Sequence, residues 1–356
     1  MSQPLGMQAV LGYGGENLHY GGDDSCVFPS GTTVRKVNYK GGGGGGGAGG
    51  GQRGQDGGNT HIPCEGLGVG AMCVHPSLQS YAYCEKGKGA VVRICDMASG
   101  AVQHTIEGAA DIDVDILTFT SDGSALLTVA GLPDFKVTIW DWMKGVELVQ
   151  GPAPSKMKTA MFNPVNPDQM LFTTADDSMY VCNVVAGAQG PEFDFEKFSP
   201  PSEELVFTSC TFTEEGAVHC TTSDGCLWVG DPVSGTVVGE SVVISAEGAK
   251  CHVIATGRHL ICWTSTGVVV WLGLGTMSEG YRVKIPLRSS DSLMSICHGE
   301  SSIFVGSQEG NIFQIKLMQD IPDGTYREEE EEPSPVTVKD ADALVGEVRT
   351  IDVSRV

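Results

Sequence analysis

The sequence predicts an all-β protein with the fold of a seven-bladed WD40-type β-propeller. The main observation is a repeated phrase: a strand rich in β-branched residues, an acidic or amide residue that ends it, and a glycine four positions later. The four clearest copies end at Asp96, Asp141, Asn183 and Asp231, so their spacings are 45, 42 and 48 residues. A repeat of about 40–45 residues with four short strands is typical of propeller blades.

The number of blades follows from the number of third strands. Fainter copies of the phrase precede and follow the four clear ones, and only Trp140-Asp141 forms the complete dipeptide, so the period carries the prediction. Residues 9–13 are a candidate fourth strand for the last blade, which would close the ring and remove its open edges. Seven third strands are expected, near Val34, Val91, Val137, Met179, Cys226, Val268 and Asn311.

The third repeat shows the expected strand order most clearly. An Asp-Gly pair between two alternating apolar runs is a strong hairpin signal, and here it is Asp122-Gly123. The four strands of this repeat are therefore predicted at 116–120, 125–129, 136–141 and 146–150.

Composition divides the chain into three parts. The propeller is predicted over residues 1–322, with a disordered, glycine-rich insertion at 41–60 in the first blade. Residues 323–345 contain an acidic run flanked by prolines and are predicted to be a solvated linker. Residues 346–356 resemble the first strand of another blade, so we expect a further, truncated repeat or propeller there.

The charge balance excludes several classes of partner. The formal net charge is −22, from 22 basic and 44 acidic residues, and no basic cluster is present. Nucleic acids and anionic membranes both require a basic surface, so neither is an expected partner. No run reaches the ~18 apolar residues of a membrane span. The twelve cysteines lie mostly in strand-like stretches and are expected to be reduced core thiols.

No catalytic, cofactor or metal site is predicted, and the chain is not expected to be an enzyme. Neighbouring Cys and His residues lack zinc spacing, and the chain has no nucleophile elbow. Asp111, Asp113 and Asp115 share one face at period two but lack the rest of a calcium loop, so a solvated edge is expected. Three tryptophans are expected to anchor neighbouring blades: Trp140, Trp228 and Trp271. The Cys and His pairs are Cys73/His75, His219/Cys220, Cys251/His252 and Cys297/His298.

Several motifs carry a resemblance to a known family. Residues 132–142 (LPDFKVTIWDW) resemble the most characteristic stretch of the ciliary WD-repeat family formed by cilia- and flagella-associated proteins forty-three and forty-four. Residues 12–20 (GYGGENLHY) and 23–31 (DDSCVFPSG) are similar to the start of forty-three, whereas 85–87 (EKG) is more similar to forty-four. Residues 161–164 (MFNP) fit both. The resemblance covers most of residues 8–235.

This resemblance implies a non-catalytic scaffold in the axoneme of motile cilia. Members of the family pair with each other in the tether and tether-head complex, which links the motor domains of inner-arm dynein to doublet microtubules. The implied partners are the paralogous tether-head protein, inner-arm dynein and doublet components. The family also has a long coiled coil that this sequence lacks. A general WD-repeat adaptor in another assembly is the alternative function.

Overall fold

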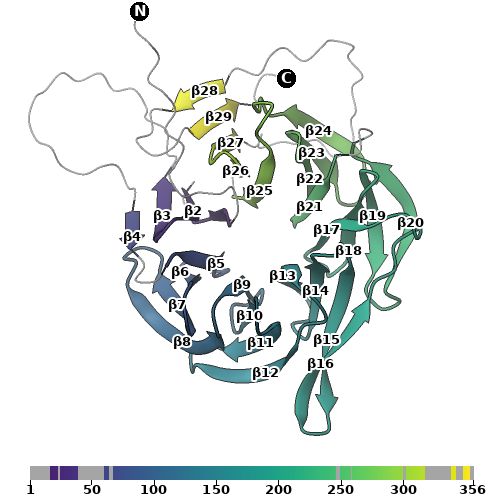
Figure 1. The fold of residues 1–356 in the computed structure, drawn as a ribbon. Coiled ribbons are helices and arrows are strands. Elements are labelled where there is room, and N and C mark those ends of the chain that lie inside the picture. Colours follow the sequence, from purple (N-terminus) through teal and green to yellow (C-terminus); the bar gives the residue numbers. More distant parts are fainter. Residues whose placement is uncertain are drawn as a thin grey trace, which may run out of the picture. The chain divides into compact units, whose positions relative to one another are not determined.

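The computed structural model describes residues 17–22, 25–38, 60–63, 67–245, 249–257, 259–299, 302–316, 338–341 and 348–352. Over these ranges the chain forms strands, turns and loops, and no helix. The strands make seven sheets, six of them with four strands (Figure 1). The prediction of an all-β, seven-bladed propeller is thereby confirmed.

The chain divides into two compact units, and residues 70–293 are the described part of the larger one. This unit holds five consecutive blades, and within each blade the strands pair in chain order. Blade 2 has β5 (Val69–Val74), β6 (Ser80–Glu85), β7 (Ala90–Asp96) and β8 (Val102–Ala110). Blade 3 has β9 (Val114–Phe119), β10 (Leu126–Ala130), β11 (Lys136–Asp141) and β12 (Val146–Pro152).

The next three blades repeat this order. Blade 4 has β13 (Met157–Phe162), β14 (Gln169–Thr174), β15 (Met179–Gly187) and β16 (Gly190–Lys197). Blade 5 has β17 (Phe207–Phe212), β18 (Val218–Thr222), β19 (Cys226–Asp231) and β20 (Thr236–Val243). Blade 6 has β21 (Cys251–Thr256), β22 (His259–Thr264), β23 (Val268–Gly273) and β24 (Glu279–Lys284).

The smaller unit brings together the first and last blades of the chain. Blade 1 has β1 (His19–Tyr20), β2 (Ser25–Ser30), β3 (Thr33–Asn38) and β4 (Thr60–Pro63). Blade 7 has β25 (Leu293–His298), β26 (Ser302–Ser307) and β27 (Ile312–Lys316). Phe28 and Val37 of blade 1 share one buried cluster with Phe304 and Ile312 of blade 7. The two ends of the repeat array therefore pack against each other.

Two C-terminal strands complete the last sheet. β29 (Val348–Asp352) pairs with β27 in parallel, and β28 (Val338–Ala341) pairs with β29. β28 falls in the predicted linker, 323–345, and β29 falls in the predicted further repeat, 346–356. The boundaries of these two segments stay predictions. The proposed closing strand at 9–13 lies outside the described residues. The predicted insertion falls between β3 and β4, and its residues 41–59 are also outside them.

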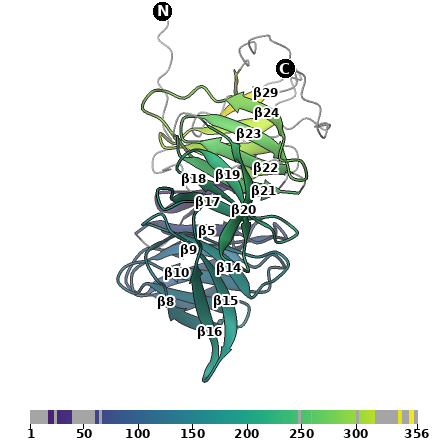
Figure 2. The same cartoon turned by 90° about the vertical axis from the view of Figure 1, so that its right-hand side faces the viewer.

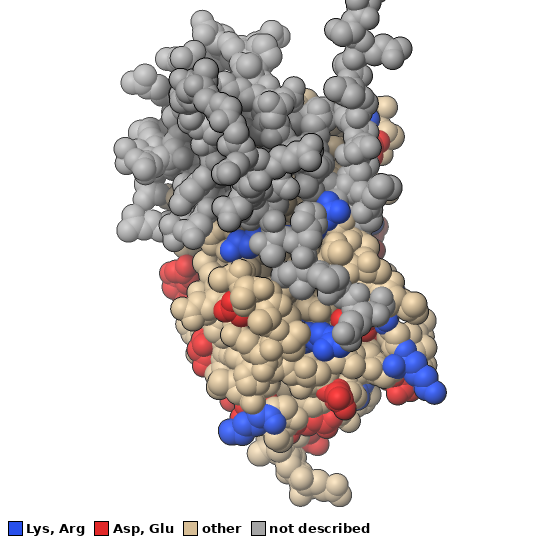
Figure 3. Space-filling view, turned by 90° about the vertical axis from the view of Figure 1, so that its left-hand side faces the viewer, with Lys and Arg blue, Asp and Glu red and all other residues tan. Residues whose placement is uncertain are grey.

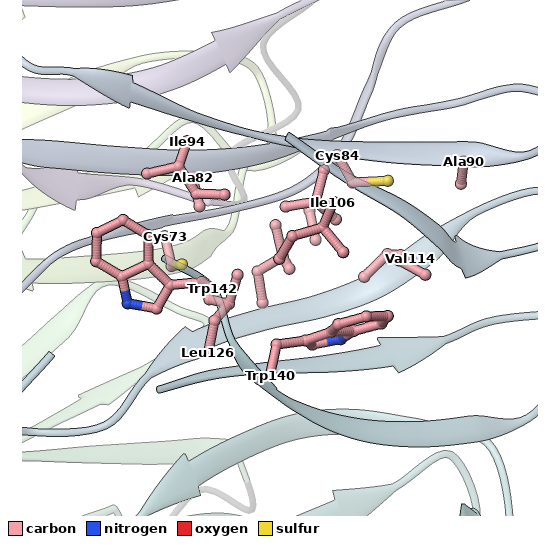
Figure 4. Packing of buried hydrophobic residues seen from close by; sticks show 14 of the residues in the cluster. Cys73, Ala82, Cys84, Ala90, Ile94, Ile106, Val114, Leu126, Trp140 and Trp142 are labelled. Carbon is pink, nitrogen blue, oxygen red and sulfur yellow. The ribbon is translucent and has the colours of Figure 1, made fainter. Parts of the chain in front are cut away.

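Apolar residues between neighbouring sheets hold the blades of the larger unit together. One buried cluster joins Ile94 and Ile106 of blade 2 to Leu126, Trp140 and Trp142 of blade 3 (Figure 4). The residues that alternate with these in blade 3, such as Leu127 and Ile139, face blade 4 instead. The period of two thus places successive side chains against different neighbours.

The tryptophans behave largely as the sequence predicts. Trp140 is 3% exposed, and its Nε1 donates a hydrogen bond to Thr128 Oγ1 at 2.9 Å. Trp271 is also buried. Trp228 is only partly buried, and its Nε1 donates to Thr222 Oγ1 at 3.0 Å. The polar atom of a buried indole needs a partner, and these hydroxyls provide it.

Turns between first and second strands also join adjacent blades. His75 Nε2 lies 3.2 Å from the carbonyl oxygen of Gly123, which belongs to the equivalent turn of the next blade. A Cβ at Gly123 would lie 2.0 Å from that same His75 atom, and the φ angle of Gly123 is +74°. Only glycine fits both the left-handed backbone and this close approach. The Asp-Gly hairpin signal thus has a second role in blade packing.

Replacing Trp140 by alanine is expected to lower the free energy of unfolding by about 3–5 kcal/mol, because it opens a cavity between blades 2 and 3. The measurement is equilibrium denaturation of the purified chain. Met143→Ala is the matched control: Met143 follows in the same hairpin, is 58% exposed, and should change stability by less than about 0.5 kcal/mol. Equal effects of the two substitutions would contradict the anchoring role of Trp140.

Candidate interaction surface on blades 2 and 3

Three loops of blades 2 and 3 meet on one side of the larger unit. They are the β6–β7 loop (86–89), the β8–β9 loop (111–113) and the β10–β11 loop (131–135). The Gly87 N–H donates to the Ile112 carbonyl at 3.0 Å, and the Gly131 N–H donates to the Asp113 carbonyl at 3.0 Å. Backbone hydrogen bonds therefore join all three loops into one surface, which we call the loop surface.

The β10–β11 loop has a fixed conformation. The Asp134 side chain accepts a hydrogen bond from the Asp111 N–H at 2.7 Å, which ties this loop to the preceding one. The Phe135 N–H donates to the Gly131 carbonyl at 3.1 Å, and the Phe135 carbonyl accepts from the Ala153 N–H at 2.7 Å. The segment 132–142, which resembles the ciliary family, thus begins in a loop fixed by hydrogen bonds to Asp111, Gly131 and Ala153.

A partly buried carboxylate lies under this surface. Asp113 Oδ2 is 3.4 Å from Lys86 Nζ, whereas its Oδ1 is buried with no hydrogen-bond partner among the residues that the structure describes. A Cβ at Gly70 would lie 2.2 Å from Asp113 Oδ1, so only glycine leaves room for this carboxylate. Burial raises the pKa of Asp113, and the nearby Lys86 opposes that shift. The charged form is therefore less favourable here than in water.

Two apolar side chains stand exposed on the same loops. Ile112 is 53% exposed and Leu132 is 64% exposed. Neither contributes to the clusters between blades, so packing does not explain their presence. Exposed apolar residues set among charged ones are typical of protein-binding surfaces, and loops on a rigid scaffold commonly carry such sites. This arrangement suits recognition of another protein.

The predicted aspartate row is part of this surface. Asp111 and Asp115 are exposed and Asp113 is partly buried. Over the described ranges, no three His, Cys, Asp or Glu side chains come together in a way that could hold a metal ion. The expected solvated edge does not hold for Asp113, whose Oδ1 is buried. Nothing in the sequence pairs Asp113 with Lys86, which lies in the segment 85–87.

The Cys and His pairs lie in strands of the blades, except for His75, which is in the β5–β6 turn. Cys73, Cys220, Cys251 and Cys297 are all buried, as are the other described cysteines, and none of them forms a disulfide. Burial raises the pKa of the Cys251 thiol to about 11. Burial also lowers the pKa of His219 and His252 to about 4. Such groups are neutral near pH 7, in keeping with structural roles.

Known proteins similar to this chain carry ciliary names. Cilia- and flagella-associated protein 43 of Mus musculus is 23% identical over 204 residues, which are 57% of this chain and 11% of that protein. Cilia- and flagella-associated protein 44 of Trypanosoma brucei brucei is 36% identical over 103 residues, 28% of this chain and 6% of that protein. Its Mus musculus counterpart is 29% identical over 106 residues. The similarity to proteins 43 and 44 predicted from the sequence is confirmed.

The remaining comparisons concern the fold. No protein-family profile matches the chain. The β-propeller domain of Cps50 (Swd1) from Myceliophteria thermophila superposes with a TM-score of 0.52 at 12% identity, covering 67% of this chain and 82% of that domain. This chain spans about a tenth or less of the length of the ciliary relatives that it matches.

Asp113→Asn is expected to change stability in a pH-dependent way. Because the pKa of Asp113 is raised in the folded state, its ionised form costs stability above that pKa, and the cost vanishes below the unfolded-state value of about 3.9. The melting temperature of the variant relative to the parent should therefore be higher at pH 7 than at pH 3.

The exposed Asp168 offers a control. Asp168→Asn removes one carboxylate from an exposed position and so controls for the loss of a surface charge. A larger loss of stability for Asp113→Asn at pH 7 than at pH 3 would mean that the ion pair with Lys86 outweighs the burial of Asp113.

Proposed function

We propose that this chain is a non-catalytic scaffold of motile cilia and flagella. The observation that carries the proposal is the similarity to cilia- and flagella-associated proteins 43 and 44. The position of two segments whose sequences resemble that family supports it. Residues 85–87 and the start of 132–142 lie far apart in the sequence but meet on the loop surface. A propeller offers rigid loops for protein partners, and this surface has the exposed apolar residues that such contacts use.

The finer proposal is a subunit of the tether and tether-head complex. In this role the propeller would help to hold inner-arm dynein motor domains at the doublet microtubule, with the paralogous WD-repeat protein as its immediate partner. The function is mechanical: a rigid body at a fixed place restrains a motor domain that must move. It requires no cofactor, and the location would be the axoneme.

Charge limits how such a scaffold reaches the microtubule. The chain has a net charge of −22, and the described face in Figure 3 carries Lys and Arg side chains interspersed with Asp and Glu rather than a basic field. The described residues also contain no helix able to cross a membrane. Tubulin surfaces are acidic, so like charges oppose direct contact. We therefore assign microtubule anchoring to a partner subunit or to another part of the full-length protein.

A ciliated strain that carries this gene provides the functional test. Loss of the gene is expected to leave cilia present but beating abnormally, with inner-arm dynein heads displaced in electron tomograms. Ile112→Ser combined with Leu132→Ser in the full-length protein should reproduce the defect, because it removes the apolar contacts without opening the core. Met143→Ser with Val233→Ser, at two exposed positions on other turns, should restore normal motility.

The outcomes separate the two parts of the proposal. A normal axoneme in the null strain would refute the tether assignment. A defective null strain that is rescued fully by the Ile112/Leu132 double variant would refute the role of the loop surface alone.

The charge argument predicts that purified residues 1–356 remain in the supernatant when bare microtubules are sedimented at physiological salt. Residual binding at low ionic strength should fall as salt is raised, since only local charge pairs could support it. Tight co-sedimentation that persists at high salt would contradict the assignment of anchoring to another partner.

A further inference from the structure

The hairpin of β15 and β16 departs from the regular blade. The two strands pair without interruption from Tyr180↔Lys197 to Gly187↔Gly190, whereas β14 pairs with β15 only as far as Asn183. The last residues of β15 and the first of β16 therefore form a two-stranded extension beyond the sheet. Figures 1 and 2 both show its tip standing clear of the neighbouring strands. We call this hairpin the blade 4 arm.

Aromatic packing fixes one face of the arm. Phe195 lies against Phe172 and Tyr180, with ring centroids 5.5 and 6.5 Å apart. Phe193 lies next to blade 3, where a Cβ at Gly151 of β12 would be 3.1 Å from its ring. Both phenylalanines pack against the cluster between blades 3 and 4. The arm is thus held rigidly at its base, and its outer strand is presented in a fixed position.

The outer edge of β16 is regular, unlike the other outer edges of the larger unit. β16 is the last strand of its sheet, and no described strand is hydrogen-bonded to its outer side. The outer strands of blades 2, 3, 5 and 6 all carry a register shift in their pairing, and β16 carries none. Bulges of this kind protect edges against added strands. Within the five blades, β16 therefore has the edge best suited to accept one.

The charges on β16 indicate what that strand would be. Glu192, Asp194 and Glu196 alternate with the two phenylalanines, so they share the opposite face of the strand. All three are exposed, and none has an ion-pair partner among the described residues. Such a row repels acidic segments, including another copy of this acidic chain. A segment with lysine or arginine at every second position would place its charges directly beside this row.

We propose that the blade 4 arm binds an extended, basic segment of a partner protein, which adds to the free edge of β16 as a fifth strand. Main-chain hydrogen bonds would supply the pairing, as in other cases of strand addition, and the acidic row would select the partner. This interaction is independent of the loop surface and does not rest on the ciliary assignment.

The experiment uses fluorescein-labelled eight-residue peptides and fluorescence anisotropy with the full chain. A peptide of alternating lysine and threonine should bind, and its binding should slow hydrogen exchange at the β16 amides. The variant Glu192→Gln, Asp194→Asn, Glu196→Gln should weaken binding about tenfold, which corresponds to about 1.4 kcal/mol, as expected for three exposed ion pairs. The variant keeps the size of each side chain and should fold normally.

Two controls separate strand addition from general charge attraction. A peptide with proline in place of each threonine has the same charge but cannot form a strand, and it should not slow exchange in β16. The variant Glu203→Gln, Glu204→Gln, Glu215→Gln removes the same charge at exposed positions in other loops, and it should bind like the parent. Equal binding of both peptides, equal weakening by both variants, or no binding at all would overturn the proposal.

Discussion

The burial of sheet faces against neighbouring blades is the interaction on which the rest of this molecule depends. Within the larger unit, separate apolar clusters join blade 2 to 3, 3 to 4, 4 to 5 and 5 to 6. A single four-stranded sheet of this composition would leave apolar faces on both sides in water, so no blade is stable alone. Because the cores lie between blades, the residues of loops and outer edges are not needed for packing, and their identity can vary.

The two candidate interaction sites use this freedom in different ways. On the loop surface, the exposed Ile112 and Leu132 and the partly buried Asp113 do not improve packing, and the raised pKa of Asp113 shows that its charge is unfavourable there. Local features that cost stability are expected where function requires them. On the blade 4 arm, Phe193 and Phe195 pack the hairpin against its neighbours. Its regular edge and its acidic row are not required for that packing.

The sequence predicts those elements whose position depends on neighbouring residues alone. The third strand of blade 3 was predicted at 136–141 and lies there, because turn residues and a β-branched run define it without help from distant parts. The loop surface could not be predicted, since Gly87 and Asp134 reach the β8–β9 loop, through Ile112 and Asp111, only when two blades pack. The blade 4 arm was missed for another reason: Gly187 follows Asn183 at the usual turn spacing, but the β-branched Val184-Val185 continues the strand and moves the turn to residues 188–189.

Rigidity and charge together restrict which partners can bind. The loop surface and the blade 4 arm belong to consecutive blades of one compact unit, so both are presented by the same packed body. The net charge of −22 disfavours non-specific contact with acidic surfaces, whereas the acidic row attracts basic segments only where the strand edge is free. At β16, selectivity for a partner would thus come from the free strand edge and the acidic row together.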